Sequence, residues 1–301
     1  MADTTLTSSA EQPARDASAF SLRFTPKTLQ TSFIYIVLIL GALISLAPFF
    51  WMISKSLMTV GQAIGSDLIP DEFLWRNYVV AWGRGNFAEY FSNSIQITLI
   101  TLAGELIFSI LAAYAFARID FPGRNAIFAL LLSTLMIPGM VYTIPNLLTV
   151  TWLGRVGPID WINNWPALTI PFMGSIFSIF LLRQFFAQIP DELYDAARID
   201  GAGHLRFLTQ IVIPLSKAPI MVIIIFSFVG TWNALAWPLL VTSSPEWTPI
   251  AVGFYAFQDE SGSELNYMMA GAFITILPIL ILYFFTQRQF TESIARSGLK
   301  G

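Results

Sequence analysis

The sequence predicts an all-α membrane protein with six transmembrane helices, and its composition and its apolar stretches both point to this fold. Apolar residues make up 55% of the 301 positions and charged residues only 12%, whereas a soluble domain carries about 25% charged residues. The mean hydropathy is +0.65, as expected for repeated burial in lipid. The net charge of −3 gives no indication of nucleic-acid binding. The chain has no cysteine, which excludes disulfides and thiolate metal sites.

Six stretches are long enough to cross a bilayer, whose apolar core of about 30 Å requires roughly 20 apolar residues in a helix. We expect these spans at residues 33–54, 90–117, 126–150, 165–182, 218–241 and 267–287. Prolines occur inside most of them, which fits helices in lipid because neighbouring helices can satisfy the freed carbonyls. The six spans form a domain over 33–287. The polar tail 1–32 before it is expected to be disordered, and 288–301 form a second tail.

The distribution of basic residues orients the six spans. Twelve of the 16 Lys and Arg fall in the two tails and in the connections 118–125 and 183–217, and four fall in the other three connections. Cytoplasmic segments are the ones that carry an excess of positive charge. We therefore predict that both termini and the connection 183–217 are cytoplasmic.

The connection 183–217 is rich in charge although its flanks are apolar, and it contains PDELYDAARIDGAG. Asp191 is a good N-cap, and Glu192 favours the positive end of a helix. Arg198 lies near the other end, and Gly201 and Gly203 can supply the C-cap. The pattern therefore predicts a short helix over 191–200.

One face of this short helix is small and apolar, because Leu193, Ala196 and Ala197 follow helical spacing. Two alanines allow another backbone to approach closely. A solvated connector on the bilayer surface and a docking helix for a cytoplasmic partner both explain this pattern. A second helical segment over 204–212 follows, and we expect Pro214 to end it at the membrane.

The segment DAARIDGAGHLRFLTQIVIP resembles the EAA loop of ABC-importer permeases. That pattern is Glu-Ala-Ala, three residues, Gly, nine residues, Ile, one residue and Leu-Pro, from which this chain departs at Asp195 and Ile213. FLLRQFFAQIPDELYDAARIDGA, AYAFARIDFPGR, WNALAWPLLV and the terminal GLKG are similar to the maltose-type (MalG-like) carbohydrate uptake group. The resemblance covers most of the chain from about residue 90 onward. It implies that group's six-span permease fold, with a cytoplasmic coupling helix, in a bacterial or archaeal inner membrane.

The resemblance also implies an assembly for sugar import by alternating access between two packings of the spans. Its partners would be a second, MalF-like permease subunit, a pair of MalK-like ATP-binding subunits and an extracytoplasmic solute-binding protein. The chain lacks the Gly-Lys-Ser/Thr of a P-loop, so ATP-Mg would bind the partners, and this chain would hold no cofactor or metal and catalyse no reaction. A permease for glycerol-3-phosphate or another polyol is the alternative. The docking residues implied are Asp191, Glu192, Leu193, Asp195, Ala196, Ala197, Arg198, Gly201 and Pro214.

Glu105 is an ionisable residue near the middle of the second predicted span. A charge there costs at least about 2.5–3.5 kcal/mol on insertion scales, so the side chain should face protein or a watery cavity. It is either a polar group in the substrate path or a protonated or hydrogen-bonded structural residue. No basic residue lies inside another predicted span to pair with it.

Aromatic and amide side chains give further candidates for a carbohydrate path, since sugars stack on aromatic faces and bond to amides. Trp232, Asn233 and Trp237 lie together in the fifth predicted span, although the two tryptophans are about 140° apart around a helix. Helix packing and interfacial anchoring are the alternative roles. Tyr142 and Asn146 share a face of the third predicted span at i and i+4.

Two outer segments have roles implied only by the resemblance. Residues 256–264 would probe the docked binding protein, and the tail SIARSGLKG would insert between the ATP-binding subunits. A solvated loop and a disordered end are the alternatives. Other functions have less support: a secondary transporter needs ionisable residues along its path, and an intramembrane hydrolase needs a base beside its serine. The only histidine, His204, lies in the connection 183–217.

Overall fold

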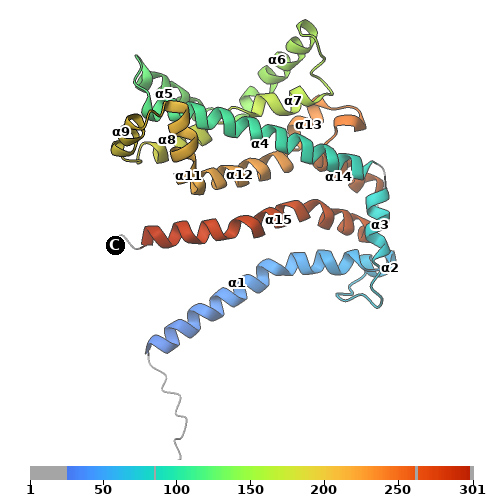
Figure 1. Ribbon diagram of the computed structural model, residues 1–301. Helices are drawn as coiled ribbons and strands as arrows, with labels where there is room; N and C mark the ends of the chain where they lie inside the picture. The colour runs from blue at the N-terminus through green and yellow to red at the C-terminus, as the bar shows by residue number, and fades with distance from the viewer. Residues whose placement is uncertain (1–25, 85, 262–263, 299–301) are drawn as a thin grey trace, which may run out of the picture. The chain divides into compact units, whose positions relative to one another are not determined.

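The computed structural model describes residues 26–84, 86–261 and 264–298, and every element in these ranges is a helix (Figure 1). The chain divides into two compact units, residues 1–50 and 51–301. The described part of the first unit belongs to α1 (Pro26–Ser56), and its side chains are exposed at every position from 29 to 50. A helix satisfies its own backbone hydrogen bonds, so this apolar surface is suited to lipid or to another membrane helix.

Four helical segments of the described chain are long and apolar enough to cross a membrane: Leu29–Ser56, Phe87–Arg118, Trp165–Phe186 and Leu265–Gln287. Two bent pairs bring the number to six if each pair is one span. These are Arg124–Met136 with Gly139–Val156, bent by 97°, and His204–Leu215 with Lys217–Trp232, bent by 80°. The all-helical, multi-span fold predicted from the sequence is confirmed. The third and fifth spans, however, are not the straight helices that we expected.

The third predicted span is broken near its middle. α5 (Arg124–Ser133) passes into the 3₁₀ turn η1 (Thr134–Met136), and a second turn, η2 (Gly139–Tyr142), leads into α6 (Thr143–Val156). Ile137 between the turns is extended (φ −84°, ψ 121°), as the residue before a proline prefers. Pro138 therefore divides this span, and Gly139 directly after it opens the second half.

The fifth predicted span, 218–241, is wrong in its second half. α12 (Lys217–Trp232) stops at Trp232, and α13 (Ala236–Val241) is a separate short helix. Asn233 ends α12 by donating a hydrogen bond from its side-chain amide to Val229 O, at 2.9 Å. Short polar side chains compete with the helix in this way. With a rise of about 1.5 Å per residue, α12 spans roughly 24 Å, which is less than a full bilayer core.

Two of the connections between predicted spans contain helices. α2 (Val60–Ile64) and α3 (Arg76–Gly83) follow α1, while η5 (Pro245–Trp247) and α14 (Ile250–Ser261) precede the last span. Lys55 at the end of α1 is only 3% exposed, and its ammonium donates to Gly65 O at 2.8 Å and Gln62 O at 3.2 Å. A buried charge needs such partners. The amide of Asn77 donates to Ser56 O and Met58 O, each at 2.8 Å, and so caps the end of α1.

The central helix of the second unit is α4 (Phe87–Arg118), which packs against α8 (Ile176–Phe186) and α12. α7 (Trp165–Thr169) and the turn η3 (Ile170–Phe172) precede α8. α15 (Leu265–Gly298) packs against α3, α12 and α14. Its helix continues to Gly298, so the predicted tail is helical up to that residue.

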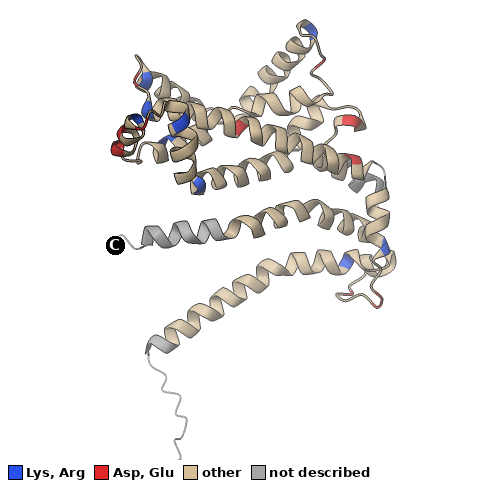
Figure 2. Ribbon diagram, in the orientation of Figure 1, with Lys and Arg blue, Asp and Glu red and all other residues tan. Residues whose placement is uncertain are grey.

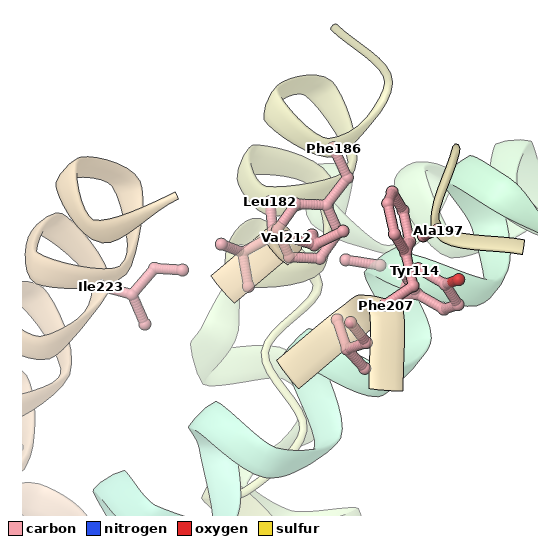
Figure 3. Close-up of a cluster of buried hydrophobic side chains, with 9 residues drawn as sticks. Tyr114, Leu182, Phe186, Ala197, Phe207, Val212 and Ile223 are labelled. Atoms are coloured by element: carbon pink, nitrogen blue, oxygen red, sulfur yellow. The ribbon is translucent and has the colours of Figure 1, made fainter. Parts of the chain in front are cut away.

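The helices between α8 and α12 form a compact end to the second unit. These are α9 (Asp191–Ile199), α10 (His204–Phe207), the π-helical turn η4 (Leu208–Val212) and α11 (Ile213–Leu215). Charged residues gather around α9 at this end (Figure 2). Beneath them lies one apolar cluster contributed by α4, α8, α9, α10, η4 and α12 (Figure 3). It contains Tyr114, Leu182, Phe186, Ala197, Phe207, Val212 and Ile223.

Candidate functional site

The short helix α9 occupies the position predicted for the docking helix, with a different start. Pro190 is the N-cap residue and makes no side-chain capping hydrogen bond, so Asp191 is the first helical residue rather than the cap. Pro190 has an extended conformation (φ −57°, ψ 140°) that turns the chain into the helix. Asp191 and Glu192 lie in the first turn, where the partial positive charge of the helix dipole favours carboxylates.

The end of α9 agrees with the prediction. Gly201 has φ +78°, the left-handed conformation that favours glycine. Gly201 N–H donates to Arg198 O at 3.0 Å, and Ala202 N–H donates to Ala197 O at 2.8 Å. These two bonds form a Schellman motif, which satisfies carbonyls that the helix end leaves open. The motif fixes the direction in which the chain leaves α9.

α9 has one face turned to the protein and one open face. Ala197 is 7% exposed and belongs to the apolar cluster. The ring of Tyr194 stacks on His204 with centroids 5.2 Å apart and meets Phe207 edge-on at 5.0 Å. Leu193 and Ala196 are exposed, so the predicted Leu-Ala-Ala face is divided between the two sides. The open face therefore carries Glu192, Leu193, Asp195, Ala196, Arg198 and Ile199.

Pro214 does not end the segment after α9, as we had expected. α10, the π-helical turn and α11 run on through Pro214, and the sharp bend comes at Ser216. A π-helical turn shifts the hydrogen-bonding pattern by one residue, and Pro214 lies at the start of the following helical turn, where its missing N–H costs least. Pro214 is exposed.

Two arginines that we had counted only as topology markers hold α4 and α8 together at this end. Arg118 donates from Nε and Nη2 to Phe186 O, at 3.0 and 2.7 Å, and also bonds Ile189 O and Asp191 Oδ1. In return, Arg183 of α8 donates from Nε to Phe116 O at 3.3 Å. The sequence indicates this role only through position, because each arginine lies within three residues of the end of its own helix.

The second candidate feature is a cavity of about 650 Å³ inside the second unit, lined by both apolar and polar side chains. It brings together Glu105 of α4, Tyr142 of η2 and Asn146 of α6, three of the residues proposed for the substrate path. Ser178 of α8 also lines it, and its hydroxyl donates to Glu105 Oε1 at 2.6 Å. Glu105 is 7% exposed. The cavity is bounded on one side by the break at Pro138, because Thr134, Leu135 and Ile137 also line it.

The lining of this cavity offers hydroxyl groups and one carboxylate, without any Lys or Arg. Thr101 and Ser227 line it with buried hydroxyls that make no hydrogen bond to the described residues. Buried polar groups are normally paired, so a solute or water with its own hydroxyls would complement them. This donor and acceptor set suits a polyhydroxylated solute.

The three candidates of the predicted fifth span have three different environments. Trp232 is 1% exposed, stacks on Phe228 and donates from Nε1 to Thr275 O at 2.9 Å, so it has a packing environment. Asn233 is exposed at the end of α12. Trp237 donates to Ala167 O at 2.9 Å and lines a smaller cavity of about 120 Å³. Phe172, Gly230 and Thr231 line both cavities.

Two segments with roles implied by the resemblance lie largely outside the described residues. Of the expected probe of the binding protein, 256–264, only the helical backbone up to Ser261 and residue Glu264 are described. The tail is described only as helical backbone up to Gly298.

Together, the helical spans, the cavity around Glu105 and the surface helix α9 define the class of protein, which is that of multi-span α-helical membrane permeases. The family model for binding-protein-dependent transport system inner membrane components matches residues 105–292. The chain belongs to this family. The match begins at Glu105 and includes α9, the Schellman motif and both arginines.

Relatives match over nearly the whole chain. The sn-glycerol-3-phosphate transport system permease protein UgpE of Yersinia pestis is 34% identical over 275 residues, which cover 88% of this chain and 96% of that protein. UgpE of Brucella abortus is 32% identical over 274 residues, with 87% and 95% covered. Among solved structures, a chain of a bacterial ABC transporter that imports the acidic polysaccharide alginate matches with a TM-score of 0.76 at 22% identity, covering 88% of this chain and 98% of that one. At that identity the likeness shows the fold alone.

Membership of the family establishes the general function. The chain is the permease subunit of a binding-protein-dependent ABC importer and a multi-pass inner membrane protein. It works in a complex that includes a periplasmic binding protein, and ATP is hydrolysed on a separate ATPase subunit. A self-contained secondary transporter and an intramembrane hydrolase are therefore excluded.

Proposed function

We propose that this permease subunit imports an uncharged sugar or related polyol, which passes the cavity around Glu105. The observation that carries the proposal is the lining of that cavity: a carboxylate, several hydroxyls, the amide of Asn146 and the ring of Tyr142. Sugars bind through such hydroxyl, amide and aromatic contacts. A cavity that presents a carboxylate and no Lys or Arg repels an anion.

The docking of the ATP-binding subunits is assigned in the same proposal to the open face of α9. Its support is a short helix whose exposed side chains include charged and small ones, at the end of the unit where basic residues gather (Figure 2). ATP-Mg bound by those subunits drives the change, and a second permease subunit completes the path. Both termini lie in the cytoplasm. The spans alternate between inward-open and outward-open packings.

The alternative substrate is glycerol-3-phosphate, which the names of the UgpE relatives favour. The two substrates predict opposite effects of Glu105→Gln. The glutamine keeps an acceptor for Ser178 and removes the charge. A hydrogen bond to a charged group contributes about 1.5–3 kcal/mol and one between neutral groups about 1 kcal/mol. Uptake of a sugar should therefore fall severalfold, whereas uptake of a phosphate ester should be unchanged or rise.

The test is uptake by the reconstituted complex with its own binding protein. The substrate is first identified by screening that binding protein against mono- and oligosaccharides, glycerol and sn-glycerol-3-phosphate. Uptake is then compared between the wild type and Glu105→Gln, with Glu89→Gln, exposed near the start of the same helix, as the matched control. Binding of sn-glycerol-3-phosphate alone, with uptake that Glu105→Gln leaves intact, would contradict the sugar proposal.

A further inference from the structure

The guanidinium of Arg118 is the polar link between the central helix α4 and the start of α9. It contacts three acceptors in succession: Phe186 O at the end of α8, Ile189 O in the turn, and the carboxylate of Asp191 in the first turn of α9. These acceptors lie 68 to 73 positions further along the chain. One side chain therefore fixes the turn between α8 and α9 to the end of α4.

The surroundings of Arg118 make this link rigid. Its side chain is 8% exposed, although it lies at the end of a helix and beside a charged surface. The last carbonyls of α8 have no partners within their own helix, and a cation is favoured at a helix C-terminus. The planar fork of a guanidinium can bond several acceptors at once in a fixed geometry, which the point charge of a lysine cannot do.

Beyond Arg118, few contacts attach α9 to the spans, and one of them is polar: the Tyr194 hydroxyl bonds the His204 ring, which also bonds the Tyr114 hydroxyl of α4. Of its side chains, only Ala197 is buried, and Tyr194 is half-buried against His204 and Phe207. The backbone between α8 and α9 is a turn over residues 187–190. Arg118 holds the start of α9, and Ala197 and Tyr194 hold its middle, so without Arg118 the start of α9 would be free to pivot about this turn.

We infer that Arg118 is a positioning residue for energy coupling: it makes α9 and the end of α4 move as one body. A displacement of α9 by the ATP-binding subunits then moves α4, which carries Thr101 and Glu105 into the substrate cavity. This role rests on the proposed docking of α9. Arg183 supports it from the other side, because its bond to Phe116 O and its position 4.0 Å from the centroid of the Phe128 ring tie α8 to α4 and α5.

Transport and ATP hydrolysis measured together give the first test. In proteoliposomes with the full complex and its binding protein, Arg118→Ala should lower the amount of substrate moved per ATP by about tenfold, within the range of measured coupling effects. ATP hydrolysis should persist and lose its dependence on the binding protein. Arg118→Lys should be intermediate. Arg124→Ala is the matched control, because Arg124 lies in the same connection and pairs with the exposed Asp120.

A distance measurement separates positioning from a general structural role. The chain has no cysteine, so spin labels can be placed at Leu111→Cys on α4 and Asp200→Cys at the end of α9, both exposed, in the assembled complex. With Arg118 present, the distance between the labels should be the same in the nucleotide-free and ATP-bound states. With Arg118→Ala, it should change between those states, because α9 follows the ATP-binding subunits and α4 does not.

The outcomes distinguish this inference from the proposed docking. Cross-linking from Leu193→Cys on α9 to the ATP-binding subunits, in the otherwise wild-type chain, tests the docking itself. If that cross-link forms and Arg118→Ala leaves either the transport per ATP or the label distance unchanged, the positioning role is wrong. If Arg118→Ala prevents copurification of the ATP-binding subunits while Arg118→Lys does not, Arg118 acts in docking, and the positioning role is again overturned.

Discussion

At the scale of single residues, the left-handed conformation of Gly201 makes the end of α9 sensitive to substitution. Gly201 and Gly203 are two positions apart, and a Cβ added to either would meet no atom within 4 Å. Only Gly201 has a positive φ, of +78°; Gly203 is extended, at φ −84° and ψ 177°. The two positions therefore differ in backbone conformation and not in available space, which makes them a matched pair.

We expect Gly201→Val to impair transport and Gly203→Val to be tolerated. A non-glycine residue in the left-handed region costs about 1–2 kcal/mol, which corresponds to a factor of roughly 5–30 in an equilibrium. The equilibrium constant for forming the correctly ended α9 should fall by that factor in Gly201→Val, and the rate of binding-protein-dependent uptake should fall with it. Equal uptake in the two variants, at equal amounts of complex in the membrane, would show that the Schellman motif does not matter to transport.

The residues that the sequence predicts well are those whose signals are local. The Gly201 motif follows from capping rules within ten positions of the chain. Arg118 could be placed only as a topology marker, because its acceptors are far away in sequence. Trp232 shows the opposite case. Its aromatic ring is of the type that binds sugars, but the ring stacks on Phe228 and donates to Thr275 O, so it packs between helices.

At the scale of elements, an ion pair joins the end of α3 to the start of α15. Arg84 pairs with Glu264, and the Arg84 guanidinium lies 4.6 Å from the centroid of the Tyr267 ring. The hydrogen bond from Arg84 holds the pKa of Glu264 below its usual value. Each side chain is 35% exposed, so solvent weakens the pair, and its contribution to stability is small.

The lowered pKa of Glu264 fixes the direction of a pH effect. A carboxylate with a lowered pKa in the folded state stabilises the protein above its unfolded pKa of about 4.3, and the contribution is lost as pH falls through the folded pKa. Thermal unfolding of the purified complex should therefore show a slightly steeper loss of stability below about pH 4.5 in the wild type than in Glu264→Gln. Identical pH profiles for the two proteins would mean that the pair contributes nothing.

The boundaries of the helices are the part of the fold that the sequence predicts least well. We expect membrane helices to tolerate prolines. Pro48 and Pro278 agree with this, because each lies inside a continuous helix. Pro138 is different because Gly139 follows it and an extended residue precedes it. The sequence does not predict α14, because its segment lies in a connection between two spans, although Ile250 is fully buried there.

At the scale of the whole molecule, the break at Pro138 connects the shape of a span to the substrate cavity. Thr134, Ile137 and Tyr142 lie on the broken stretch and line the cavity beside Glu105. A permease that alternates between two packings needs elements with two stable arrangements. A continuous helix through residues 124–156 would replace the extended residue and the two 3₁₀ turns, and would remove this wall from the cavity.

We predict that Pro138→Ala combined with Gly139→Ala favours that continuous helix and slows transport. Proline and glycine inside a helix cost about 3 and 1 kcal/mol relative to alanine, so the two substitutions together shift the equilibrium constant towards the continuous helix by up to about a thousandfold, at about 1.4 kcal/mol per tenfold. Pro145→Ala is the control, because Pro145 lies in the first turn of α6, where a proline costs little. Uptake by the reconstituted complex should fall strongly in the double variant and remain near wild type in the control. Normal transport by the double variant, at an unchanged membrane level, would contradict this prediction. The broken span would then be a fixed feature of the fold that takes no part in switching, because favouring the continuous helix would not have affected transport.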